Sequence, residues 1–121
     1  MPIPRSQLRF TPDELEEFLR TERTVRVGTV SKDGEPHVAP LWFVWHDGAM
    51  YFNSLKRSRR SRDIERGSRV SACVDAGHEY AELRGAVGLG IVNDTAYFVV
   101  FSNPNLLYKV SLTSAKDWYK N

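Results

Sequence analysis

The chain has 121 residues and a mass of 13.9 kDa, enough for one hydrophobic core and too short for two independent ones. Hydrophobic residues make up 41% of it and charged residues 26%, which excludes intrinsic disorder for most of its length. Because Cys73 is the only cysteine, an internal disulfide framework is excluded and a reducing compartment is favoured. We therefore expect a cytoplasmic protein with a single domain over residues 1–121.

The sequence contains no segment typical of a secretory signal, a membrane span or a metal site. The first ten residues hold two prolines and two arginines without a continuous apolar stretch, so we expect no signal there. The longest apolar runs, residues 39–45 and 96–101, are far shorter than the ~20 residues of a membrane helix. Three histidines and one cysteine lie scattered without ligand spacing, so we expect no metal.

The net charge of +2 is unevenly distributed along the chain. Seven of the 17 basic residues lie within residues 56–69 together with two acidic residues, so this segment carries +5 and the remainder −3. Proteins that bind long polyanions usually spread positive charge over a wide surface. The distribution therefore favours a local site for a small anion.

The first predicted element is a helix over residues 12–22. Thr11 and Glu14 have the spacing of a capping box, and Pro12 suits the first helical position. Apolar residues at i, i+3 and i+4 predict one buried face, formed by Leu15, Phe18 and Leu19.

From residue 24 onward the sequence changes to short segments rich in Val, Phe, Tyr and Trp. Turn dipeptides separate these segments, among them Asp33-Gly34, Asp47-Gly48 and Asn93-Asp94. The predicted strands cover residues 24–31, 37–46, 49–54, 69–75, 80–92, 96–101 and 106–113. A second short helix is predicted between the third and fourth strands, over residues 58–66 before Gly67.

These elements predict a mostly β fold with minor α, built as a small antiparallel barrel, because a parallel sheet would need more helical crossovers. The segment from Leu41 to Trp45 is apolar on both of its alternating faces. One face can line the barrel, and the other must be covered by something else. With one amphipathic helix available as a cover, we expect a homodimer.

The end of the third strand and the start of the second helix form a candidate phosphate site. Ser58 is placed to cap a helix whose first turn contains Arg59 and Arg60, and cations there oppose the helix dipole. An anion would make this arrangement favourable, held by backbone N–H groups, the guanidinium groups and the hydroxyls of Ser54 and Ser58. The alternative is a solvated basic helix in which Arg59 pairs with Asp63.

Several segments resemble, in their order and spacing, the pyridoxamine 5′-phosphate oxidase-like split-barrel family. Residues 27–45 are similar to its opening hairpin, and Ser58-Arg59-Arg60 and Arg69-Val70-Ser71 to its phosphate loop and following strand. Glu82-Leu83-Arg84-Gly85 also matches, and the similarity runs from about residue 24 to residue 90. The resemblance implies a homodimeric split β-barrel that binds FMN or the deazaflavin coenzyme F-420 between its subunits.

The resemblance also implies cofactor-binding residues. The residues implied to hold the cofactor phosphate are Ser54, Ser58, Arg59 and Arg60. The residues implied to lie against the ring system are Val38, Ala39, Pro40 and Leu41. The oxidases of the family usually place an arginine in this second strand, and its absence here argues against oxidation of pyridoxamine phosphate. Residues 40–43, Pro-Leu-Trp-Phe, look more like the actinobacterial branch that includes users of F-420, so we favour F-420 over FMN.

The function implied by the resemblance is an oxidoreductase whose cofactor transfers hydride to or from a small organic substrate, with no acid–base residue assigned. An alternative is a carrier, store or sensor that binds the cofactor without turnover. A third reading is a small nucleic-acid binder that uses the arginine-rich helix. Reduction of an acceptor distinguishes the enzyme from the carrier, and steep salt dependence of oligonucleotide binding would favour the third reading.

Overall fold

The fold was determined as a computed structural model, which describes residues 10–100 and 103–120, with side chains except at residues 80, 90–91, 93–100, 103–105 and 111–120. The helices are α2 (Pro12–Thr21), α3 (Arg59–Glu65) and the short 3-10 helix η1 (Tyr80–Glu82). The strands are β1 (Thr24–Val30), β2 (Pro36–Trp42), β3 (Val44–His46), β4 (Ala49–Leu55), β5 (Val70–Ala76), β6 (Arg84–Val100) and β7 (Asn103–Lys120).

The strands form one antiparallel sheet in the order β2-β1-β5-β6-β7-β4-β3. The two edge strands, β2 and β3, are neighbours in sequence and belong to opposite ends of this order, so the sheet curls towards closure. They do not pair with each other, and the barrel stays split. This confirms the predicted mostly β fold with minor α and a split antiparallel barrel.

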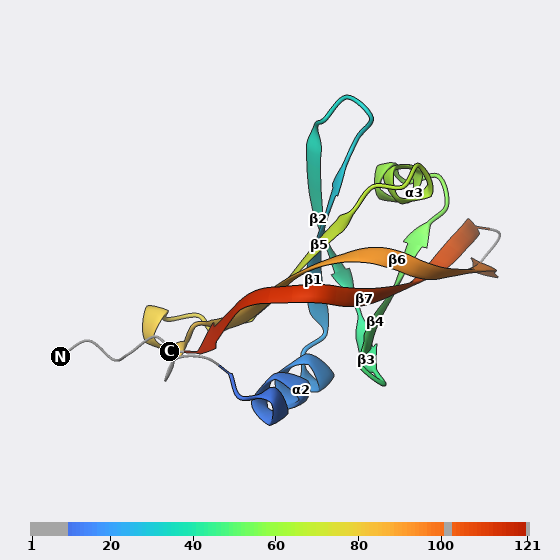
Figure 1. The fold of residues 1–121 in the computed structure, drawn as a ribbon. Coiled ribbons are helices and arrows are strands. Elements are labelled where there is room, and N and C mark those ends of the chain that lie inside the picture. The colour runs from blue at the N-terminus through green and yellow to red at the C-terminus, as the bar shows by residue number, and fades with distance from the viewer. Residues whose placement is uncertain (1–9, 101–102, 121) are drawn as a thin grey trace.

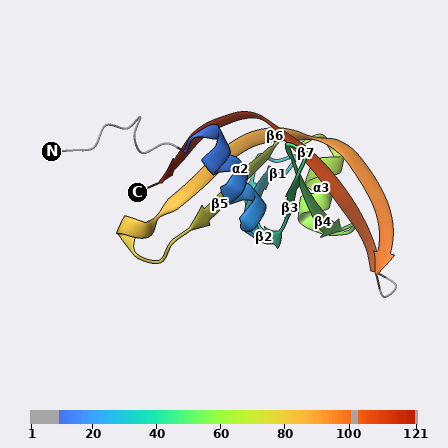
Figure 2. The same cartoon turned by 90° about the horizontal axis from the view of Figure 1, so that it is seen from below.

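The two α-helices lie at opposite ends of the barrel, with α3 beside the β1–β2 hairpin (Figure 1). β6 and β7 form a long ribbon that curves over the shorter strands (Figure 2). One part of this ribbon pairs with β5 and another with β4, so it joins the two halves of the sheet. None of the helices in the described ranges is long and apolar enough to cross a bilayer.

Helix α2 begins at the predicted capping box. Thr11 Oγ1 accepts a hydrogen bond from the Glu14 backbone N–H at 3.2 Å, and Glu14 Oε1 accepts one from the Thr11 N–H at 3.0 Å. The Trp45 indole donates to Glu16 Oε2 at 2.8 Å, which fastens the helix to β3. Of the three residues predicted to form the buried face, Phe18 and Leu19 are buried, and Leu15 is partly buried against the core.

The core lies inside the curled sheet, and its buried residues change from apolar to polar along the barrel. Its centre is apolar, with Val25, Val27, Met50 and Phe52 almost fully buried. The buried polar residues identified in the described chain are Thr29, Ser54, Ser61 and Asp63. All four belong to α3 or contact it, so the polar end of the interior lies beneath this helix.

Several predicted strand boundaries were wrong. The strand predicted over residues 37–46 is divided at Phe43, which is buried and donates its N–H to the carbonyl of Arg23 at 2.8 Å. The strands predicted over 80–92 and 96–101 form a single strand, β6, which begins at Arg84 because residues 80–82 form the 3-10 helix η1; residue 101 lies outside the described residues. Strand β7 extends well beyond residue 113. The predicted turn at Asn93-Asp94 is absent because the β6–β7 ladder continues through it with a register shift between Val92 and Asp94.

Candidate functional site

Helix α3 begins at its predicted cap. Ser58 has an extended backbone, and its Oγ accepts a hydrogen bond from the Ser61 N–H at 3.1 Å. The first turn contains arginines and no acidic residue. The helix has only seven residues, so its side chains, more than its dipole, decide what binds there.

Three side chains contact the hydroxyl of Ser54, at the end of β4. Ser54 Oγ accepts from Ser61 Oγ at 2.8 Å and from Arg60 Nε at 3.1 Å, and it lies 3.0 Å from Ser58 Oγ. Ser54 and Ser61 are buried, with 2% and 0% of their surface exposed. We call Ser54, Ser58 and Ser61 the serine cluster. It joins the end of β4 to the first turn of α3.

Arg60 is a half-buried cation that has no counter-ion among the described residues. Burial lowers the pKa of its guanidinium, and this effect is only partly opposed by the Tyr108 hydroxyl. Its Nε donates to the serine cluster, and no carboxylate of the described residues pairs with it. A buried cation is stabilised by an opposite charge within a few ångströms. Arg60 therefore favours an anion at this position.

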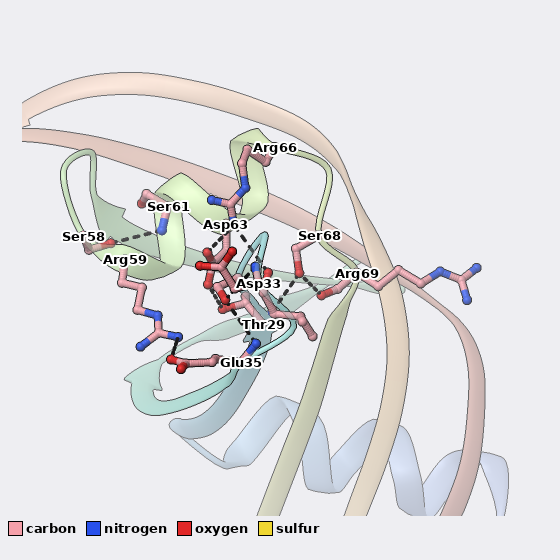
Figure 3. Close-up of polar contacts among 12 residues, drawn as sticks. Thr29, Asp33, Glu35, Ser58, Arg59, Ser61, Asp63, Arg66, Ser68 and Arg69 are labelled. Carbon is pink, nitrogen blue, oxygen red and sulfur yellow. Dashed lines mark hydrogen bonds and ion pairs between the residues drawn. The ribbon is translucent and has the colours of Figure 1, made fainter.

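The Arg59 side chain extends towards Glu35, which directly precedes β2 (Figure 3). Its Nη2 lies 3.5 Å from Oε2 of Glu35, and both side chains are exposed, so the ion pair is weak. The alternative pairing of Arg59 with Asp63 is not formed. Asp63 is buried and bonds Thr29 and Arg66 instead.

The residues predicted to face the ring are divided between the two faces of β2. Val38 and Pro40 are exposed on the outer face. Ala39 and Leu41 are partly buried on the inner face, where Leu41 packs against the core. Only Val38 and Pro40 therefore present their side chains to a ligand on the outside of the barrel.

The outer face of the sheet beside Val38 carries mostly small or apolar residues. Val38, Gly28, Ser71 and Leu89 occupy paired positions on β2, β1, β5 and β6, and we call this row the outer row. A Cβ atom on Gly28 would lie 2.4 Å from Ser71 Oγ and 3.7 Å from Val38 Cγ2. The Ser71 hydroxyl therefore fills the space that a side chain at position 28 would need, and glycine is the residue that allows this close contact between β1 and β5.

Sequence reasoning missed Ser61 as part of the site. The only signal was its spacing of three residues from the cap Ser58, which places its N–H on the capping hydroxyl. Its contact with Ser54 depends on how the chain turns between β4 and α3, which local sequence patterns do not specify.

A cavity of about 740 Å³ lies at the other end of the barrel, beside α2. Its lining includes Asp13, Glu14, Glu17 and Glu82 together with Arg84. Carboxylates repel a phosphate group, so this cavity does not fit the predicted ligand.

Solved structures share this fold at low sequence identity. The conserved hypothetical protein Rv2991 of Mycobacterium tuberculosis has a TM-score of 0.79 and 17% identity, covering 98% of this chain and 90% of that one. A protein described as F420 reductase has a TM-score of 0.69 and 19% identity, covering 82% and 93%. The FAD-binding protein of Mycobacterium smegmatis has a TM-score of 0.69 and 15% identity, covering 93% and 99%.

Sequence comparison gives the family. No curated protein matches the chain. The family model described as pyridoxamine 5′-phosphate oxidase matches residues 11–105, which include both α-helices, β1 to β6 and the serine cluster. The chain therefore belongs to the pyridoxamine 5′-phosphate oxidase family.

Proposed function

We propose that the chain binds the phosphate of a flavin or deazaflavin cofactor at the serine cluster, Arg59 and Arg60, and that it works as an oxidoreductase on a small organic substrate. The observation that carries the proposal is the half-buried Arg60 guanidinium. Burial lowers its pKa, and no carboxylate of the described chain neutralises it. A phosphate beside it would supply the missing negative charge.

The donor set around this point suits a phosphate more than a single carboxylate. The Arg60 guanidinium and the Ser58 hydroxyl contact Ser54, and the same helix turn carries the Arg59 guanidinium, which pairs weakly with Glu35. A phosphate presents three oxygen acceptors and up to two negative charges, so it can use all of these donors together.

The spacing between this site and the outer row suits a cofactor with a chain between its phosphate and its ring. Arg59 reaches Glu35, directly before β2, and Val38 lies three residues further, or ~10 Å along the strand. The extended ribityl chain of a flavin is a spacer of this kind. A ring held at that distance would lie against the exposed side chains of Val38 and Pro40.

The cofactor, when bound, supplies the hydride chemistry. The residues of this chain hold its phosphate, set the orientation of its ring and shield one ring face from water. We assign no acid–base residue. Lys56, Arg57 and Arg62 add positive charge outside the serine cluster, which suits the polyglutamate tail of F-420 better than FMN, so F-420 remains our preferred cofactor.

The same outer surface supports the proposal of a homodimer. Val38 is 65% exposed, Trp42 77% and Val44 63%, on the consecutive strands β2 and β3. Exposed apolar side chains in a row are typical of an interface. A second copy on this surface would cover them and enclose the cofactor ring between subunits.

Titration of the protein with FMN and with F-420, followed by fluorescence, tests the proposed site. Arg59→Ala and Arg60→Ala should each weaken binding roughly tenfold to a hundredfold, because each removes a charge-assisted contact of about 1.5–3 kcal/mol. Arg23→Ala is the matched control, since it removes the same charge from an exposed side chain before β1, and it should leave binding unchanged. Binding of neither cofactor, or equal effects of Arg60→Ala and Arg23→Ala, would overturn the proposal.

Turnover is tested separately. The reduced cofactor bound to the protein should be oxidised when small unsaturated or aromatic acceptors are added. Stoichiometric binding without oxidation across such a series would identify a carrier or sensor.

A further inference from the structure

Counting lone pairs in the serine cluster fixes the direction of its hydrogen bonds. A serine hydroxyl has one proton to donate and two lone pairs to accept with. Ser54 Oγ uses both lone pairs, because it accepts from Ser61 Oγ at 2.8 Å and from Arg60 Nε at 3.1 Å. The proton of Ser54 must therefore be the one shared with Ser58 Oγ, 3.0 Å away.

For Ser58, the same count shows that its hydroxyl proton has no partner in the cluster. Ser58 Oγ accepts from the Ser54 hydroxyl and from the Ser61 N–H at 3.1 Å, which uses both of its lone pairs. Its own proton has no acceptor within the cluster. Ser58 is only half-buried, so this proton is directed to the side where a ligand can reach it.

We propose that Ser61 is a positioning residue of the phosphate site, which directs the Ser58 proton outward and so selects a ligand oxygen that accepts a hydrogen bond. This inference rests on the proposed phosphate-binding function. Ser61 is fully buried and does not touch the ligand. It acts through Ser54, whose second lone pair it occupies.

Without the Ser61 hydroxyl, the directions of the hydrogen bonds between Ser54 and Ser58 are no longer fixed. Ser54 would have a free lone pair, and Ser58 would then be able to donate inward to it. In that arrangement a bound phosphate meets the Ser58 lone pairs instead of its proton. Ser58 Oγ and a phosphate oxygen repel each other when no proton lies between them, so the affinity for phosphate falls.

Two pairs of ligands isolate the phosphate contribution: FMN with riboflavin, and F-420 with its deazaflavin chromophore lacking the phosphate-bearing side chain. Ser61→Ala should weaken binding of the phosphate-bearing ligand by about 2- to 13-fold, the value of one hydrogen bond, and leave binding of the phosphate-free ligand unchanged. Ser61→Cys keeps a weak donor in a similar volume and should give an intermediate loss. The Cys variant also serves as the test if the Ala variant fails to fold.

Tyr108→Phe is the matched control. The Tyr108 hydroxyl also lies within hydrogen-bonding reach of Ser61, and it donates to Glu65 Oε1 at 3.0 Å. If the Ser61 proton belongs to Ser54, removing the Tyr108 hydroxyl leaves the ratio of the two affinities unchanged. A changed ratio would mean that the Ser61 proton is directed to Tyr108, and the inference would be overturned.

The outcomes separate this inference from the proposed function. If Ser61→Ala weakens both members of a ligand pair equally, its role is structural and the inference fails. If Arg60→Ala weakens FMN or F-420 binding but Ser61→Ala does not, the phosphate site stands and the positioning role is wrong. If the unmodified protein binds neither cofactor, both are wrong.

Discussion

The hydroxyl of Thr29 donates a hydrogen bond to the buried carboxylate of Asp63 at 2.9 Å, across 34 residues of sequence. The other oxygen of the carboxylate accepts from Arg66 Nη2 at 2.5 Å. Asp63 is 1% exposed, so its charge depends on these two partners. Together they pin α3 to the end of β1 (Figure 3) and hold the serine cluster in place.

Replacing Asp63 with Asn should destabilise the protein by about 1–3 kcal/mol. The amide oxygen still accepts from Thr29, but the buried charge that holds Arg66 is lost. Urea denaturation measures the change in the free energy of unfolding. Thr29→Val is the comparison, with an expected loss of about 1 kcal/mol, because it removes one hydroxyl and keeps the shape. Stability of the Asn variant equal to that of the unmodified protein would show that α3 is held by other contacts.

Replacing Glu35 with Gln should strengthen FMN or F-420 binding by roughly 2- to 5-fold at low salt. Glu35 competes with the ligand for Arg59, and an exposed pair of this kind contributes up to about 1 kcal/mol. The gain should disappear in high salt, where exposed charges are screened. Glu79→Gln, an exposed residue near η1, removes the same charge away from the site and should have no effect. Equal gains from both variants would point to net charge alone.

The sequence predicted local structure well where a side chain bonds to the backbone a few residues away, as in a helix cap. Thr11 and Ser58 were both predicted as caps, and both accept the backbone hydrogen bonds that caps make. The turn predicted at Asn93-Asp94 failed because its local preference is weaker than a ladder of backbone hydrogen bonds with β7, which a bulge accommodates.

The site was predictable in its residue types more than in its contacts. Serines and arginines beside a helix start predicted an anion, and the structure brings Ser54, Ser58 and Arg60 into contact. The bond between Tyr108 and Glu65 spans 43 residues and depends on the β4–β7 pairing. No local pattern specifies such a contact, because it follows from the register of strands far apart in sequence.

Replacing Trp42 with Glu should convert a dimer to monomers. Trp42 is the most exposed of the large apolar side chains on β2 and β3, and a charge at the centre of an apolar interface costs 2 kcal/mol or more, roughly 30-fold or greater in dissociation constant. Analytical ultracentrifugation measures the oligomeric state. Leu83→Glu places the same charge on an exposed apolar residue between η1 and β6 and should leave the dimer intact. An unmodified protein that sediments as a monomer would contradict the proposed dimer.

The Tyr108 hydroxyl should make the protein lose stability at alkaline pH. Burial, opposed in part by the nearby Ser61 hydroxyl and reinforced by the hydrogen bond to Glu65, raises the pKa of Tyr108 to about 12, above the value of about 10 for an unfolded tyrosine. The neutral phenol is therefore favoured in the folded state. This contribution is complete below pH 10 and is lost as the pH rises to about 12, because the unfolded chain releases its proton first. Tyr108→Phe should reduce the loss measured by urea denaturation between pH 9 and 11.5, whereas Tyr51→Phe, on neighbouring β4, should retain it. A Tyr108→Phe variant that loses stability as steeply as the unmodified protein would assign the alkaline transition to other groups.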